Sequence, residues 1–166
     1  CNRDYYVWVD LTPHTSSCER FSQQADLVVR RPMAELDRVA WTYGSCKANS
    51  IQHFYSDVTE IESKNNIAVE VEDISINTDP ESLSIMLFQS EVGDEPPIDP
   101  NIDDADASAT RALGKMYAIK LNYLQLTAGR LILTVQCGAN DVRFRAVARL
   151  IHAELSEGAF VTGMMY

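Results

Sequence analysis

The sequence predicts an all-β protein folded as an antiparallel β-sandwich, either a jelly roll or a fold similar to one. Along its 166 residues, short stretches of alternating apolar and polar residues recur, a period typical of half-buried strands. Turn-forming clusters of Pro, Gly, Asn and Asp separate these stretches. A chain of this length buries about 70% of its unfolded surface on folding, which is enough for a packed core.

Six strands are expected in the first half of the chain. In residues 5–11, Tyr6 and Trp8 point to one face while Tyr5 and Val7 point to the other. The remaining stretches are residues 26–30, 38–43, 51–58, 67–74 and 83–89. Thr-Pro, Arg-Pro, Gly-Ser and Lys-Asn-Asn clusters lie between them, and short strands spaced in this way are typical of an antiparallel sandwich.

Residues 91–107 interrupt this alternation with prolines and acids. Residues 91–110 hold seven acids and no base. Proline cannot donate to a strand ladder and like charges repel, so we expect an acidic, Pro-rich linker or long exposed loop at 91–114. It would divide the chain into a sandwich domain at 1–90 and a second, incomplete sandwich unit at 115–166. The alternative is that all the strands build one larger sandwich.

Three further strands are expected at residues 117–123, 130–137 and 142–150. A Gly-Ala-Asn-Asp turn joins the last two as a hairpin. The region 142–155 also fits a helical stripe, formed by Phe144, Val147, Ala148, Ile151 and Leu155. We favour a strand here, because the preceding strand and the turn provide it with a partner.

The charge distribution bears on the partners of the protein. The formal net charge of −10 argues against binding nucleic acid, which requires clustered Lys and Arg. Residues 1–90 hold 14 acids and seven bases, whereas residues 111–166 hold three acids and seven bases. An acidic front and a basic rear favour end-to-end attraction between copies or neighbouring modules, with ordinary surface variation as the alternative. No stretch approaches the ~20 apolar residues of a membrane span.

The four cysteines indicate an oxidising compartment. They are Cys1, Cys18, Cys46 and Cys137, and none lies in a metal-binding spacing. We predict a secreted or cell-surface protein with a Cys18–Cys46 disulfide, because both residues fall in polar stretches beside predicted strands. The alternative is four reduced thiols in a cytosolic protein.

Residues 25–90 resemble the pre-peptidase C-terminal (PPC) domain family of small secreted β-sandwiches. The resemblance lies in the sequences ADLVV at 25–29, VAW at 39–41, NIAVEVE at 66–72 and SIML at 84–87. YYVWV at the start of the chain resembles the opening strand of the family, which extends the match to residues 5–90. Residues 117–150 resemble a partial second copy. The resemblance implies a noncatalytic accessory or structural role.

One acidic cluster has the spacing of calcium ligands. Asp99, Asn101 and Asp103 follow the pattern that opens an EF-hand loop, and Asp104 and Asp106 lie close by. However, Asp104 occupies the position that normally requires Gly, and the twelfth position of the loop is Thr rather than Glu. We therefore favour a solvated acidic segment and expect no cofactor, with Ca²⁺ as the alternative.

Candidate catalytic groups are sparse. Glu70 and Glu72 share one face of a predicted strand, as a pair of catalytic carboxylates would, but outward-facing acids on a half-buried strand explain them equally well. His14, His53 and His152 lie far apart in the sequence, and no Ser or Cys stands in a nucleophile motif. We predict that the protein is not an enzyme.

Aromatic side chains in the first half of the chain are candidates for binding. Tyr6, Trp8 and Trp41 could stack on sugars or contact a protein partner, although aromatic residues of strands usually belong to the core. We predict a noncatalytic extracellular structural or adhesive module. It would assemble with copies or neighbouring modules into a tandem or fibrous array, through strand edges and complementary charge. The alternative is a carbohydrate-binding accessory module.

Overall fold

The computed structural model describes residues 32–76, 82–110 and 113–151. These residues form nine strands and two short 3₁₀ turns, η1 (Glu62–Lys64) and η2 (Ile102–Asp104). The strands are β1 (Ala34–Glu35), β2 (Thr42–Cys46), β3 (Ile51–Val58), β4 (Asn66–Asp73), β5 (Leu83–Ser90), β6 (Ala107–Ala109), β7 (Met116–Leu121), β8 (Gly129–Cys137) and β9 (Val142–Ile151). No helix in this part of the chain is long and apolar enough to span a membrane.

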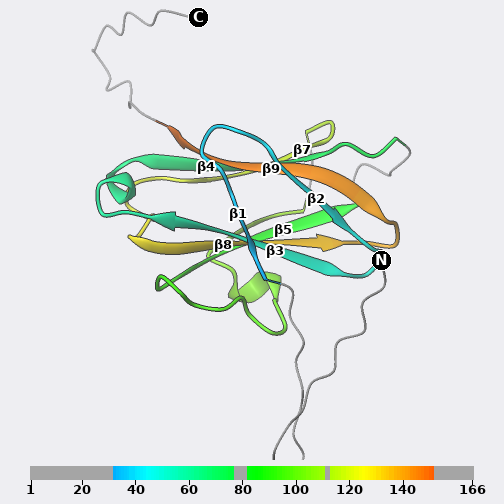
Figure 1. Cartoon of the computed structure of the whole chain (residues 1–166), viewed down its shortest axis with the longest axis horizontal. Coiled ribbons are helices and arrows are strands. Elements are labelled where there is room, and N and C mark those ends of the chain that lie inside the picture. Colours follow the sequence, from blue (N-terminus) through cyan, green and yellow to red (C-terminus); the bar gives the residue numbers. More distant parts are fainter. Residues whose placement is uncertain (1–31, 77–81, 111–112, 152–166) are drawn as a thin grey trace, which may run out of the picture. The chain divides into compact units, whose positions relative to one another are not determined.

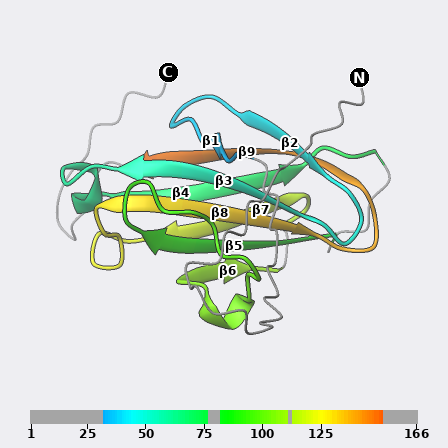
Figure 2. The same ribbon diagram turned by 60° about the horizontal axis from the view of Figure 1, so that its bottom comes forward.

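The strands form two sheets that pack face to face (Figures 1 and 2). Sheet A has the order β1-β3-β8-β5-β6, and sheet B has the order β2-β9-β4-β7. Every pairing between neighbouring strands is antiparallel except the two-residue pairing of β1 with β3. The predicted all-β sandwich is therefore confirmed.

Strands from both halves of the chain share both sheets. β8 lies between β3 and β5 in sheet A, and β9 lies between β2 and β4 in sheet B. Without the second half, each sheet would lose a central strand, so the predicted boundaries around residues 91–114 do not separate two sandwiches. The described residues form the one larger sandwich, which was the other arrangement that the sequence left open.

The core consists of the inward-facing side chains of both sheets. Phe54 of β3 and Phe144 of β9 meet edge to face, with ring centres 5.7 Å apart. Gly44 of β2 leaves room for this contact, because a Cβ atom there would lie 2.6 Å from the ring of Phe144 and 2.9 Å from that of Phe54. Other core residues are Ile67, Val69, Val71, Leu83, Ile85, Leu87, Leu131, Leu133, Val135 and Ala146.

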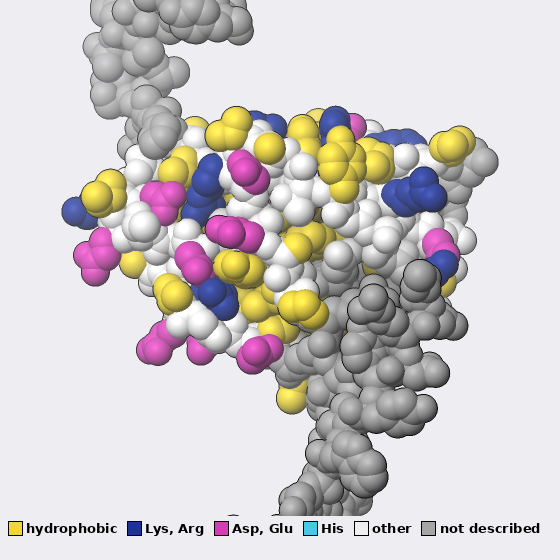
Figure 3. Space-filling view, viewed as in Figure 1, with side chains coloured by type: hydrophobic (Ala, Val, Ile, Leu, Met, Phe, Trp, Pro, Cys, Tyr) yellow, Lys and Arg dark blue, Asp and Glu magenta, His cyan; other side chains and the backbone are white. Residues whose placement is uncertain are grey.

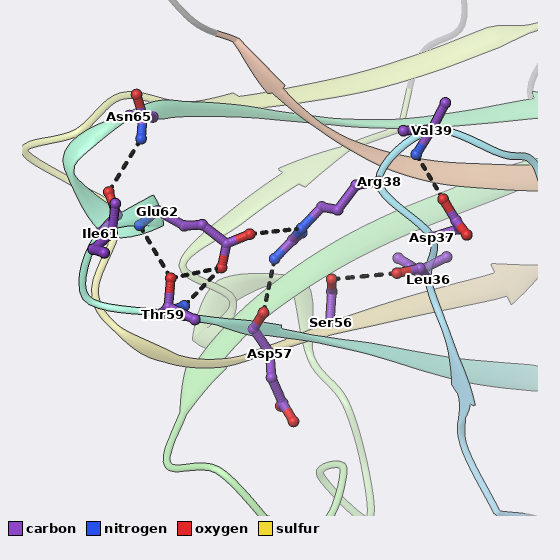
Figure 4. A network of polar contacts seen from close by, with 10 residues as sticks. All are labelled: Leu36, Asp37, Arg38, Val39, Ser56, Asp57, Thr59, Ile61, Glu62 and Asn65. Carbon is purple, nitrogen blue, oxygen red and sulfur yellow. Dashed lines mark hydrogen bonds and ion pairs between the residues drawn. The ribbon is translucent and has the colours of Figure 1, made fainter.

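Most of the predicted strands agree with the structure to within two residues at each end. The strand predicted at 142–150 is confirmed as β9, so the helical alternative for this region is wrong. The strand predicted at 38–43 begins only at Thr42, because the Asp37 carboxylate holds a turn. It accepts the backbone N–H of Val39 (Figure 4) and that of Ala40. The strands predicted at 5–11 and 26–30 lie outside the described residues.

A disulfide joins Cys46 to Cys137. Cys46 ends β2 in sheet B, Cys137 ends β8 in sheet A, and both are buried where these strand ends meet. The predicted Cys18–Cys46 pairing is therefore wrong. It treated Cys46 as a loop residue near Cys18 in sequence, whereas the sandwich brings Cys46 to a residue 91 positions away. Cys1 and Cys18 lie outside the described residues.

Candidate functional site

The outer face of sheet B carries alternating charges on its two central strands. Arg145 and Arg149 of β9 point outward and face the glutamates of β4. Arg145 Nε lies 2.5 Å from Glu72 Oε2, and Arg149 Nε lies 3.3 Å from Glu70 Oε2. The register pairs Glu72 directly with Arg145, which explains why these two side chains meet.

Trp41 lies against both arginines. The guanidinium carbon of Arg145 is 4.5 Å from the centre of the indole ring, and that of Arg149 is 5.3 Å away. Both distances are within the range of cation–π attraction. Arg149 also donates to the carbonyl of Val39, in the segment that leads to Trp41. Residues of β9 therefore hold both the indole and the backbone just before it.

These contacts orient both guanidinium groups. The hydrogen bond with Glu72, above all, raises the pKa of Arg145, and Tyr43 contributes in the same direction. Tyr43 stands beside Arg145 on β2, with 68% of its surface exposed. We name this set the Trp41 face, and it comprises Trp41, Tyr43, Glu70, Glu72, Arg145 and Arg149.

The Trp41 face has the composition of a protein-binding hot spot. Trp, Tyr and Arg are the residues most enriched at such sites, because they combine a large contact area with directed hydrogen bonds. Neighbouring Arg143 is exposed and, among the described residues, forms no ion pair. A carboxylate brought to this face would meet guanidinium groups that are already oriented, so little conformational entropy would be lost.

The outer face of sheet A is covered instead by residues 91–106, which we name the acidic segment (Figures 1 and 2). Pro96 is buried, and so are Met86 and Ile132, which point outward from the sheet. At the end of the acidic segment, Asp106 accepts the backbone N–H of Gln89 at 2.6 Å. The segment predicted as a linker or a long loop is therefore a loop that packs on the sandwich.

Arg130 of β8 fastens the acidic segment to sheet A. It donates to both carboxylate oxygens of Asp57, at 2.7 and 3.1 Å, and stacks 4.3 Å from the centre of the Tyr55 ring. It also donates to the backbone carbonyl of Asp94 in the acidic segment at 3.4 Å. The hydrogen bonds with Asp57 raise the pKa of Arg130, so the side chain stays charged.

The predicted calcium ligands do not converge on one point. Asn101 uses its side-chain oxygen to accept the backbone N–H of Asp103, and Asp106 is engaged by Gln89. Among the residues that the structure describes, no three His, Cys, Asp or Glu side chains are placed to hold a metal ion. Asp99 and Asn101 instead border a shallow hollow of about 410 Å³, lined further by Ser84, Met86, Pro100, Ile102 and Gln136.

The remaining candidates divide into those with structural partners and those not described. Glu70 and Glu72 each hold an arginine, which leaves them unlike a free catalytic pair. His53 Nδ1 lies 2.9 Å from Thr134 Oγ1 on sheet A. Trp41 belongs to the face defined above. Tyr6, Trp8, His14 and His152 lie outside the described residues.

The strand edges predicted to mediate assembly are short or partly closed. β1 has two residues and β6 has three, and the edge of β2 is engaged where Gln52 accepts the N–H of Ser45. In an antiparallel ladder, hydrogen-bonded and non-hydrogen-bonded residue pairs alternate. Asp73 N donates to Lys115 O, so these residues form a hydrogen-bonded pair, and the register then directs the backbone groups of Ala118 and Lys120 away from β4. The edge of β7 therefore presents backbone groups that have no partner in sheet B, and Lys120 lies on this strand as a charge that opposes sheet extension.

Comparison with known proteins gives little further guidance. No family model and no curated protein matches this sequence. A solved structure with some similarity is PliG from Aeromonas hydrophila, described as a periplasmic lysozyme inhibitor of g-type lysozyme. It is 10% identical with a TM-score of 0.44, over 72% of this chain and 97% of that chain. The function of the present chain has to follow from its own surface.

Proposed function

We propose that this chain is a noncatalytic protein-interaction module that docks an acidic partner on the Trp41 face. The observation that carries the proposal is the stacking of Arg145 and Arg149 on one indole, each guanidinium being fixed by a glutamate at the surface of a rigid sheet. Such preorganised groups bind with less loss of side-chain entropy than mobile ones.

Local charge supports an acidic partner. The outer face of sheet B presents Arg143, Arg145, Arg149 and Lys120 against Glu70 and Glu72, an excess of two positive charges in a chain whose net charge is −10. Complementary potentials of this kind set partner choice and orientation. The exposed ring of Tyr43 adds an amphipathic contact beside the arginines.

The disulfide supports an extracellular or periplasmic location. Bonds such as Cys46–Cys137 form and persist in oxidising compartments and are rare in the cytosol. The more specific secreted or cell-surface location and the adhesive role stay predictions, as does membership of the PPC family.

Binding of poly-L-glutamate to the full chain tests the proposal. A Trp8→Phe background leaves Trp41 as the only tryptophan, so that its fluorescence reports directly on the Trp41 face. We expect saturable binding of poly-L-glutamate and none of poly-L-lysine. The double variant Glu72→Gln/Arg145→Gln keeps the net charge of the face while removing one oriented guanidinium, and it should weaken binding about tenfold or more.

Lys120→Gln is the matched control. It removes one positive charge from the same sheet, but on β7, which lies three strands away from β2. We expect it to weaken binding by no more than about twofold, as exposed charges do. Equal losses in the two variants would mean that only diffuse charge attracts the polymer, and the proposal would then be wrong.

The carbohydrate-binding alternative is less well supported at Trp41. Sugar rings stack on an open aromatic face, whereas two guanidinium groups already lie within 5.3 Å of the indole centre. A glycan array probed with the full chain tests this alternative. Glycan binding that is lost in Trp41→Ala or Trp8→Ala, with no binding of poly-L-glutamate, would favour it.

A further inference from the structure

We infer that the acidic partner is a second copy of this chain, whose acidic segment docks on the Trp41 face so that copies stack head to tail. The inference rests on the proposed function and names the occupant of the face. It follows from where the structure places the two charged surfaces and from which carboxylates it leaves available.

The acidic segment is presented in an ordered form. Arg130 and the Asp106–Gln89 contact fasten it, and β6 pairs with β5 directly after it. The carboxylates of Asp103 and Asp104 are exposed and, among the described residues, have no hydrogen-bond or ion-pair partner. Carboxylates held on a fixed loop are the chemistry that oriented guanidinium groups bind best.

The two surfaces lie on opposite sides of the sandwich. Figure 3 shows several Lys and Arg side chains along the upper margin, over sheet B, and most of the Asp and Glu side chains on the left and along the lower margin, with a few basic side chains among them. Figure 1 places the acidic segment at that lower margin, beneath sheet A. One copy can therefore offer its Trp41 face to one neighbour and its acidic segment to another.

This arrangement determines the symmetry of the assembly. A two-fold dimer built on the Trp41 face would bring together two surfaces that each carry excess positive charge, and one built on the acidic segment would bring acids against acids. Pairing of unlike surfaces is heterologous, and because the surfaces face opposite directions it leaves a free surface at each end. The assembly therefore grows without a fixed size.

Salt should act in two directions. The net charge of −10 makes whole copies repel one another at very low ionic strength, where the Debye length is about 30 Å. At about 0.15 M salt the Debye length falls to about 8 Å, so contact between the two surfaces outweighs that repulsion. At about 0.5 M the local attraction is itself screened. Association should be strongest at the intermediate salt concentration.

Mixing two one-sided variants of the full chain tests the inference by sedimentation velocity. Asp103→Asn/Asp104→Asn disables the acidic segment, and Glu72→Gln/Arg145→Gln disables the Trp41 face. We expect the wild type to grow in size with concentration, each variant alone to remain monomeric, and an equimolar mixture to stop at a 1:1 dimer. Circular dichroism and urea unfolding establish that both variants are folded.

Three results would overturn the inference. These are a wild type that is monomeric at all salt concentrations, a wild-type dimer of fixed size, and one-sided variants that each assemble as the wild type does. Failure of the equimolar mixture to form dimers would also overturn the inference. If poly-L-glutamate still bound the Trp41 face in those cases, the proposed function would stand and only the identity of its partner would be wrong.

Discussion

The outer faces of the two sheets carry the same chemical unit in two different settings. On sheet A, Arg130 stacks on Tyr55 and pairs with Asp57, whereas on sheet B, Arg145 stacks on Trp41 and pairs with Glu72. The Arg130 side chain is 14% exposed and also holds the acidic segment, while that of Arg145 is 32% exposed.

The difference shows that an aromatic–arginine–carboxylate unit has no fixed role. The unit on sheet A is covered by the acidic segment and acts as a clamp, because the Arg130 guanidinium is engaged by Asp57, by the Tyr55 ring and by that segment. The unit on sheet B lies at the surface, where we propose that it binds a partner. What lies over the unit, rather than its composition, separates a structural contact from a candidate docking site.

The largest effect is expected from the disulfide, which keeps both faces on one rigid body. It joins β2, next to Trp41, to β8, which carries Arg130. Cys46→Ala/Cys137→Ala should lower the free energy of unfolding by about 4 kcal/mol, because the bond closes a loop of 91 residues in the unfolded chain. Urea denaturation measures the change.

A matched variant separates this bond from the other cysteines. Cys1→Ala/Cys18→Ala leaves Cys46 and Cys137 intact and should change the free energy of unfolding by less than about 1 kcal/mol. If this variant were as unstable as the first, the pairing of the four cysteines would differ from that in the structure.

Removing the two arginines in turn sharpens the comparison between the faces. Arg130→Gln should cost about 2 kcal/mol of stability, since it breaks charged hydrogen bonds to Asp57 and releases the acidic segment. Arg145→Gln should cost about 0.5 kcal/mol, because its ion pair is about one-third exposed and screened by solvent. Urea unfolding gives both values.

Hydrogen exchange localises the same effects. Exchange at residues 91–106 should accelerate in Arg130→Gln and stay unchanged in Arg145→Gln, because only Arg130 touches that segment. Equal destabilisation by the two substitutions, or faster exchange of the acidic segment in both, would contradict the division between a clamp and an open face.

Much of the fold could be predicted from the sequence. Period-two alternation located β3, β4, β5, β8 and β9 because each has one face in the core and one outside it. Short edge strands were missed, since the two residues of β1 and the three of β6 are too few to show a period.

The site was less predictable, because its parts meet only through tertiary pairing. Trp41 and Arg145 were both visible in the sequence, but nothing local indicates that β2 lies beside β9. The same holds for Cys46 and Cys137, and for Arg130 and Asp57, which are 73 residues apart. Strand order and register determine which of these residues come into contact, and neither can be derived from a single alternating stretch.

A smaller effect than that of Arg130→Gln is expected where a third arginine, Arg38, joins the residues just before Trp41 to sheet A (Figure 4). Arg38 donates to the carbonyl of Asp57 at 2.8 Å and lies 3.4 Å from Glu62, which also accepts the N–H and hydroxyl of Thr59. The backbone N–H of Thr59, above all, lowers the pKa of Glu62 below its ordinary value of 4.5, and the Thr59 hydroxyl and Arg38 act in the same direction.

Because its pKa is lowered in the folded state, Glu62 contributes stability that is fully present above pH 4.5 and is lost as the pH falls through the lowered value. Glu62→Gln should therefore cost about 1 kcal/mol at pH 7, the usual net contribution of a hydrogen bond such as those from Thr59, and nearly nothing at a pH below the lowered value. Urea unfolding of both proteins across this range measures the difference. A cost independent of pH would mean that the side chain acts through packing rather than charge. In that case, Arg38 would not provide an electrostatic link between the Trp41 face and sheet A.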